Sequence, residues 1–225
     1  MKIAGLKPRR RWSLWMALAI ASAGTTAVRA EPCEGMIRTK TVTAGNGGAR
    51  VYVEESRRPL IDAPGICGES VTAFLAKDRG AFVPIFAQKA NREWPSNSLT
   101  VVDWSPDGHY VLLELRQSNA EGEKLAETPL VYDTLERRIY RLNLLKLFQG
   151  HFRRKCAVNA SLKGFTAGSE VVVAATPQEP DTTYESLQLP SCVVSQTRFA
   201  VDFRKGRLRQ ISVESESGVQ VRQTP

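Results

Sequence analysis

Histidine is scarce in this sequence of 225 residues, and its four cysteines include no Cys-x-x-Cys pair. The only histidines are His109 and His151. Structural zinc sites and thioredoxin-like sites need closely spaced cysteine or histidine ligands. Asp103 and Asp107 lie close together, but they lack the six or more oxygen ligands of a calcium loop. We therefore expect no metal site, no redox dithiol and no cofactor.

Catalytic motifs are also missing. A nucleophile elbow reads Gly-x-Ser-x-Gly, and the nearest stretch, residues 68–72, lacks the final glycine. The glycine-rich residues 45–48 lack the further glycine and the helix of a dinucleotide-binding fingerprint, and they are typical of a hairpin turn. His109 lies beside Ser105 and Asp107, but neighbours in one tight turn seldom reach the geometry of a triad. The sequence predicts a non-catalytic protein; the alternative is a hydrolase whose site is assembled from distant residues.

Acidic residues are absent from the first thirty positions, which carry six basic residues. A cationic start up to Arg11 is followed by the uncharged residues 12–28 and by Ala30, which completes a small-x-small cleavage pattern. We expect residues 1–30 to be a signal peptide, Glu31 to begin the mature chain, and the protein to be exported to a periplasmic or extracellular location. The alternative is an uncleaved leader that anchors the protein, since the uncharged run is close to the length of a membrane span.

The net charge of +8 belongs mostly to this leader. The remaining residues contain 25 basic and 23 acidic side chains, so the mature chain is close to neutral. Basic clusters such as residues 153–155 and 204–209 therefore indicate solvated turns rather than a nucleic-acid track. We expect no nucleic-acid partner, and contact with a membrane only through an uncleaved leader.

All four cysteines follow the leader, at Cys33, Cys67, Cys156 and Cys192. Export would bring them into an oxidising compartment, where two disulfides are expected. Three connectivities are possible. We favour Cys33 with Cys67 and Cys156 with Cys192, because each pair closes a loop within one half of the chain. On the chain-entropy model, each such loop contributes about 3–4 kcal/mol to stability.

Apolar residues after position 31 come in short runs separated by polar or glycine-containing turns, a rhythm typical of β-strands. The strongest predicted hairpin joins residues 98–104 to residues 109–116. Residues 70–77 fit either a strand or a short helix. Residues 142–153 have apolar side chains near helical spacing and indicate one short connecting helix. The sequence predicts an all-β fold of antiparallel sheets.

Two parts of the chain repeat the same order of turns. Residues 165–166 precede a valine-rich strand as residues 104–105 precede another, and Asp202 ends an apolar run as Asp133 does. The first offset is 61 residues and the second is 69, so the later unit has a longer middle. The excess lies in the polar loop 176–191, a natural site for an insertion. This recurrence indicates an internal repeat.

The five residues Trp104, Ser105, Pro106, Asp107 and Gly108 form a motif that resembles the WD40-like propeller repeat of TolB-type periplasmic proteins and of prolyl oligopeptidase propeller domains. The resemblance implies a tight turn between two strands of a blade. The residues suit this role independently: proline presets φ, aspartate can bond to the turn backbone, glycine takes positive φ and tryptophan covers the sheet face. The second copy of the repeat is degenerate.

Ring closure is not expected. Propellers use four to eight blades of roughly 40–45 residues, whereas the wider repeat spacing here leaves room for about three units. We expect an incomplete propeller-like or open β assembly with blade-like sheets. The predicted regions after the leader are an N-terminal β-rich region at 31–97, a first blade-like repeat with the connecting helix at 98–155, and a second, degenerate repeat at 156–225.

Trp94 is the candidate binding residue. It stands in a polar stretch ahead of Pro95, and a tryptophan in such a loop can anchor a protein partner or plug the end of a sheet. We expect an exported, non-catalytic β-repeat protein that binds a protein or an envelope component through blade edges and loops. The alternative is a structural subunit whose propeller is completed by formation of a homo-oligomer.

Overall fold

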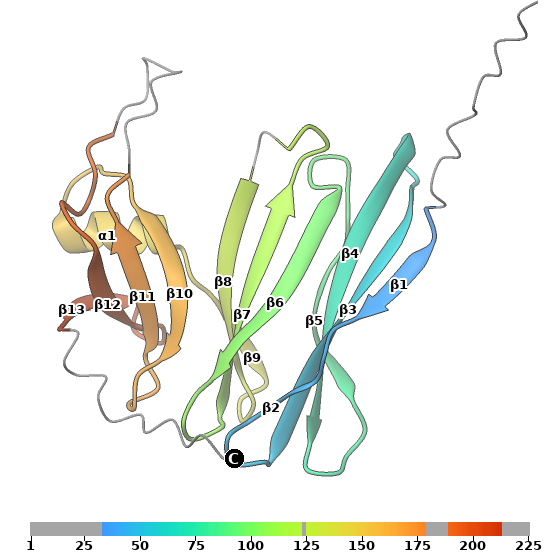
Figure 1. Cartoon of the computed structure of the whole chain (residues 1–225), viewed down its shortest axis with the longest axis horizontal. Coiled ribbons are helices and arrows are strands. Elements are labelled where there is room, and N and C mark those ends of the chain that lie inside the picture. Colours follow the sequence, from blue (N-terminus) through green and yellow to red (C-terminus); the bar gives the residue numbers. More distant parts are fainter. Residues whose placement is uncertain (1–32, 123–124, 179–188, 213–225) are drawn as a thin grey trace, which may run out of the picture. The chain divides into compact units, whose positions relative to one another are not determined.

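The computed structural model describes residues 33–122, 125–178 and 189–212, so the expected signal peptide lies outside the described residues. The described chain forms three antiparallel sheets and one helix, as Figure 1 shows. None of the sheets formed by these residues closes on itself. The expected open, all-β architecture with one short helix is confirmed.

The first sheet, blue to teal in Figure 1, contains a long hairpin. Its strands are β1 (Gly35–Arg38), β2 (Val42–Thr43), β3 (Ala49–Leu60), β4 (Ala63–Lys77) and β5 (Val83–Gln88). Strands β1 and β2 follow one another along β3, so the sheet has four strand positions. Residues 70–77, for which a helix was the alternative, belong to β4, because buried Val71, Ala73 and Leu75 alternate with more exposed residues on a pleated strand.

The second and third sheets are four-stranded meanders that run in chain order, as blades of a propeller do. The second contains β6 (Ser96–Trp104), β7 (Tyr110–Ser118), β8 (Leu125–Asp133) and β9 (Arg138–Arg141). The third contains β10 (Asn159–Phe165), β11 (Val171–Thr176), β12 (Thr197–Asp202) and β13 (Arg207–Ile211). The longer middle of the third sheet lies between β11 and β12, where the sequence places the insertion.

Helix α1 (Leu144–Phe152) connects the second sheet to the third. The Asn143 side chain caps its first turn by accepting the Lys146 N–H at 2.9 Å. Arg153 ends the helix in the left-handed conformation, with φ of 51°. The helix buries Phe148 against Phe199 of the third sheet, with ring centroids 5.0 Å apart.

The middle sheet lies between two cores. On β7, Val111, Leu113 and Leu115 belong to a core shared with the first sheet, whereas Leu112 belongs to a core shared with the third sheet and α1. Successive residues of a strand point to opposite faces, so one apolar run serves both cores. The burial of these side chains packs the middle sheet against the sheet on either side of it.

Candidate functional site

Similar turns join the first two strand positions of the three sheets, although the third turn closes one residue earlier than the other two. In each turn the backbone N–H of one residue donates across the hairpin, and the carbonyl oxygen of the same residue accepts the N–H of the residue three positions further on. The three turns are as follows: Ala44 bonds to Ala49 O at 2.9 Å and Gly47 N at 2.8 Å, Ser105 to Tyr110 O at 2.9 Å and Gly108 N at 2.8 Å, and Thr166 to Glu170 O at 2.8 Å and Ser169 N at 3.0 Å. In each turn, the residue three positions further on, which donates the second of these hydrogen bonds, has a positive φ. The values are 73° at Gly47, 71° at Gly108 and 60° at Ser169.

The first of these turns lies in residues 31–97, the predicted N-terminal β-rich region outside the two predicted repeats. Ala44, Ser105 and Thr166 are spaced by 61 residues each time, and β2 to β5 have the strand order of the other two sheets. The spacing and the glycine at position 47 were the signals that could have revealed it. They were hidden because this copy has neither the tryptophan nor the proline of the motif.

The five motif residues form a tightly bonded turn. Trp104 is the last residue of β6 and lies in the core between the first and second sheets, 7% exposed. The Ser105 hydroxyl donates to Asp107 Oδ1 and accepts the Tyr110 N–H at 2.8 Å. His109 gives its backbone N–H to the same Asp107 oxygen at 3.0 Å. These bonds show that the side chains of Ser105 and Asp107 take part in the hydrogen bonding of the turn.

Asp107 also connects the sheets. Its carbonyl oxygen accepts the Asn46 side-chain N–H at 3.1 Å from the first sheet's turn, and Oδ2 accepts the Ser169 hydroxyl at 3.1 Å from the third sheet's turn. Burial alone would raise the pKa of this carboxyl, but the hydrogen bonds from Ser105, His109 N–H and Ser169 outweigh it, so the pKa of Asp107 lies below its ordinary value. The turn motif therefore links the second sheet to the turns of the first and third sheets by hydrogen bonds.

A second link joins the middle sheet to the third. The Asp103 carboxylate accepts the Phe165 N–H at 3.2 Å. Gly164 makes room for it, since a Cβ at this position would lie 2.3 Å from Asp103 Oδ2. Asp103 and Asp107, which the sequence does not predict to bind calcium, thus each accept a hydrogen bond from the third sheet or its turn.

Trp94 lies in the loop between β5 and β6 and is half-buried. Its N–H donates to Asn91 Oδ1 at 2.8 Å, and its carbonyl accepts the side-chain N–H of the buried Asn97 at 3.2 Å. The neighbouring Pro95 carbonyl accepts the Glu69 N–H at 2.7 Å. The backbone of this loop therefore links the first and second sheets by hydrogen bonds, and Trp94 is only half-buried beside it.

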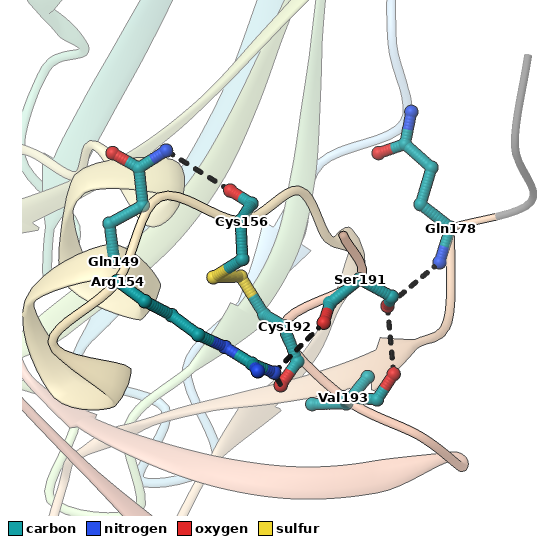
Figure 2. The surroundings of a disulfide bond; sticks show 7 residues. All are labelled: Gln149, Arg154, Cys156, Gln178, Ser191, Cys192 and Val193. Carbon is teal, nitrogen blue, oxygen red and sulfur yellow. Dashed lines mark hydrogen bonds between the residues drawn. A yellow bond between two sulfur atoms is a disulfide. The ribbon is translucent and has the colours of Figure 1, made fainter. Parts of the chain in front are cut away.

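Two disulfides join Cys33 to Cys67 and Cys156 to Cys192, which are the pairs expected from the sequence. Figure 2 shows the second, which ties the segment before β10 to the segment before β12. The Arg154 guanidinium donates to the carbonyl oxygens of Ser191 at 3.0 Å and Cys192 at 3.3 Å. This network fixes the end of the inserted loop against the chain that follows α1.

Apolar side chains are exposed where the first sheet ends. Strand β1 pairs with β3 alone among the described strands, so its other edge is open. Met36 and Ile37 on β1 are each 66% exposed, and Ile61 at the tip of the β3–β4 hairpin is 100% exposed. The Cys33–Cys67 disulfide fixes the start of β1 beside the base of that tip. An open strand edge with apolar side chains is suited to pairing with another chain.

A cavity of about 560 Å³ lies between α1 and the hairpin of β12 and β13. Lys146 of the helix and Arg207 of β13 line it, together with His151. The charge pattern predicts residues 204–209 to be a solvated turn, and nothing in the sequence connects them with the helix. No spacing pattern in the sequence indicates that Lys146 and Arg207, which come from distant parts of the chain, line the same cavity.

Two kinds of site are absent from the part of the chain that the structure describes. Its His, Cys, Asp and Glu side chains form no group of three or more that could hold a metal ion. None of its helices has the length and apolar composition needed to cross a membrane.

No protein-family model matches the chain, and no curated protein matches it. It is similar to a solved structure described as "The beta-propeller domain of the Trilobed protease from Pyrococcus furiosus reveals an open velcro topology", with 10% identity and a TM-score of 0.35. The match covers 79% of this chain and 44% of that chain, so this chain spans less than half of the other. The class rests on the sheets themselves, which form an open, propeller-like all-β assembly.

Proposed function

We propose that this is an exported, non-catalytic β-repeat protein that binds another protein of the cell envelope at the open edge of its first sheet. The exposed Met36, Ile37 and Ile61 carry the proposal, since such side chains beside an unpaired strand edge suit the addition of a strand from a partner. We further propose that the three sheets are WD40-like repeats of the TolB type. The bonded turn at Ser105 and its counterparts at Ala44 and Thr166 support this.

Export is supported by two disulfides and by the charge pattern of residues 1–30. Protein isolated from the envelope or from the culture medium is expected to begin at Glu31. Sequencing its N-terminus checks this. Material outside the cytoplasm that still began at Met1 would contradict cleavage at this site.

Photocross-linking tests the binding surface. A photoreactive phenylalanine replaces Met36 in one variant and Leu135 in the other, because Leu135 is similarly exposed, at 63%, but lies in the turn between β8 and β9. We expect a discrete product with a partner protein from position 36, and its loss when Ile37→Glu is added. The proposal fails if both positions give the same products. Products formed only with copies of this chain would favour the self-associating subunit instead.

A further inference from the structure

The cavity between α1 and the β12–β13 hairpin is a second candidate site, separate from the edge of the first sheet. Its volume of about 560 Å³ lies in the range of small-molecule sites, about 300–1,000 Å³. Its floor is apolar, with buried Leu142 and Phe203 and half-buried Leu147 and Leu208. This floor can hold a ring or a short aliphatic chain.

Two positive charges at this cavity have no partner among the described residues. Lys146 and Arg207 line the cavity and take part in none of the ion pairs that these residues form. Asp202 lies opposite Arg207 in the strand register, but its carboxylate pairs with Lys205 at 3.6 Å. No described carboxylate lines the cavity. Both charges are therefore available to an anion.

Arg141 also lines the cavity, but its charge is directed elsewhere. Its guanidinium carbon lies 5.7 Å from the centre of the Phe86 ring, in the core that the first and second sheets share. Lys146 and Arg207 are thus the lysine and arginine side chains of the cavity lining that have no partner among the described residues.

His151 keeps the wall of the cavity in place. Its Nδ1 lies 3.1 Å from the carbonyl oxygen of Leu208, and since a carbonyl can only accept, Nδ1 carries the proton. This bond ties α1 to β13, so the two elements that supply Lys146 and Arg207 hold a fixed relation. A preformed wall lowers the conformational entropy that the protein loses when a ligand binds.

We propose that this cavity binds a small molecule that carries one carboxylate or phosphate group beside an apolar body. The anion lies near Lys146 and Arg207, and the apolar body lies over Phe203 and Leu208. The same anionic group can come from a free metabolite or from a lipid headgroup. This inference is independent of the partner proposed for β1, because the two sites share no residue.

Titration followed by amide NMR shifts tests the proposal, with three probes of one shape: 2-naphthoate, 2-naphthyl phosphate and the neutral 2-naphthalenemethanol. We expect the two anions to shift the amides of Gly150, His151 and Gly206 and to bind more tightly than the alcohol. Lys146→Ala and Arg207→Ala should each weaken anion binding about tenfold, as expected for loss of a charged hydrogen bond. Lys163→Ala removes an equal charge from β10, outside the cavity, and should leave binding unchanged.

Sedimentation with vesicles distinguishes the two sources of the anion. Binding to phosphatidylglycerol but not phosphatidylcholine vesicles, lost in Lys146→Ala and kept in Lys163→Ala, would identify a lipid headgroup. Naphthyl binding without vesicle binding would identify a free small molecule. The proposal is overturned if the alcohol binds as tightly as the anions, if Lys163→Ala weakens binding as much as Lys146→Ala, or if neither the probes nor the vesicles bind.

Discussion

Asp107 bonds to all three sheets, although its side chain is short and lies in a surface turn. Its carboxylate accepts hydrogen bonds from Ser105 and His109 in its own turn and from Ser169 in the third sheet, and its carbonyl accepts one from Asn46 in the first sheet. Aspartate fits this position because a carboxylate can accept several hydrogen bonds at once. Asp107, which the sequence predicts to lie in a turn, thus also forms hydrogen bonds between the sheets.

Acid should remove the contribution of Asp107 to stability. Its pKa in the folded chain is lowered, so its stabilisation is fully present above the unfolded-state pKa of about 3.9 and is lost as pH falls through the folded-state pKa. We expect Asp107→Asn to reduce the free energy of unfolding by about 1 kcal/mol at pH 7 and by less at pH 3. Denaturant melts at both pH values measure this. Asp62→Asn, at the exposed hairpin tip, is the control, and an equal loss at both pH values would contradict the assignment.

Trp104 should be structural. Its ring is 7% exposed in the core between the first two sheets, so Trp104→Ala is expected to cost about 3–5 kcal/mol. Its buried indole N–H has no acceptor among the described residues, so Trp104→Phe should cost much less, since it removes an unsatisfied donor. Trp94→Ala, at a half-buried position, is the comparison and should cost less than Trp104→Ala. Thermal melts check the order, and an unchanged midpoint for Trp104→Ala would refute the role of this residue.

At the scale of elements, the repeated hairpin turn does more than reverse the chain. The Gly108 turn faces Asn46 so closely that a Cβ on Gly108 would lie 2.3 Å from the Asn46 amide nitrogen. Gly47 has nearly the same φ but open space around it. The two glycines therefore share one conformational demand and differ in a single contact between sheets.

Substitution of these glycines should separate the two effects. Gly47→Ala is expected to cost about 1–2 kcal/mol from left-handed strain alone, and Gly108→Ala should cost more because Asn46 must also move. In an Asn46→Ala background, the cost of Gly108→Ala should fall to that of Gly47→Ala. Denaturant melts of the single and double variants provide the cycle. Equal costs for the two glycine substitutions in the natural background would show that the first and second turns do not touch.

Elements with strong local signals were predictable from the sequence. The hairpin around residues 105–108 has proline, aspartate and glycine at the positions that the turn demands, and α1 has helical apolar spacing before a left-handed residue. The full length of β3 and β4 was not predictable, because the outer part of this hairpin has a polar run at 54–58 and prolines and glycines at 59, 64, 65 and 68. The cavity was not predictable either, since Lys146 and Arg207 belong to separate elements that only tertiary packing brings together.

At the scale of the whole described chain, the stack ends in charged faces. On the face of β3 opposite the core, the Arg38 guanidinium lies 4.2 Å from the centre of the Tyr52 ring, and the Arg50 guanidinium lies 5.2 Å from that of Phe82. The third sheet carries the ion pair between Arg209 and Glu170. Arginine stacked on an aromatic ring covers apolar surface while its charge stays in water. Among the described residues, both outer faces therefore carry charged side chains.

The central claim is that the middle sheet packs one face against the first sheet and the other against the third. Methyl NOE spectroscopy on protein labelled at isoleucine, leucine and valine tests it directly. Leu113 and Leu115 should show cross-peaks to Val51, Val53 and Val71 of the first sheet, whereas Leu112, next in the chain, should show them to Val171, Val173 and Val201 of the third. Cross-peaks from Leu112 and Leu113 to the same neighbouring sheet, or from neither to any other sheet, would contradict the stacked arrangement.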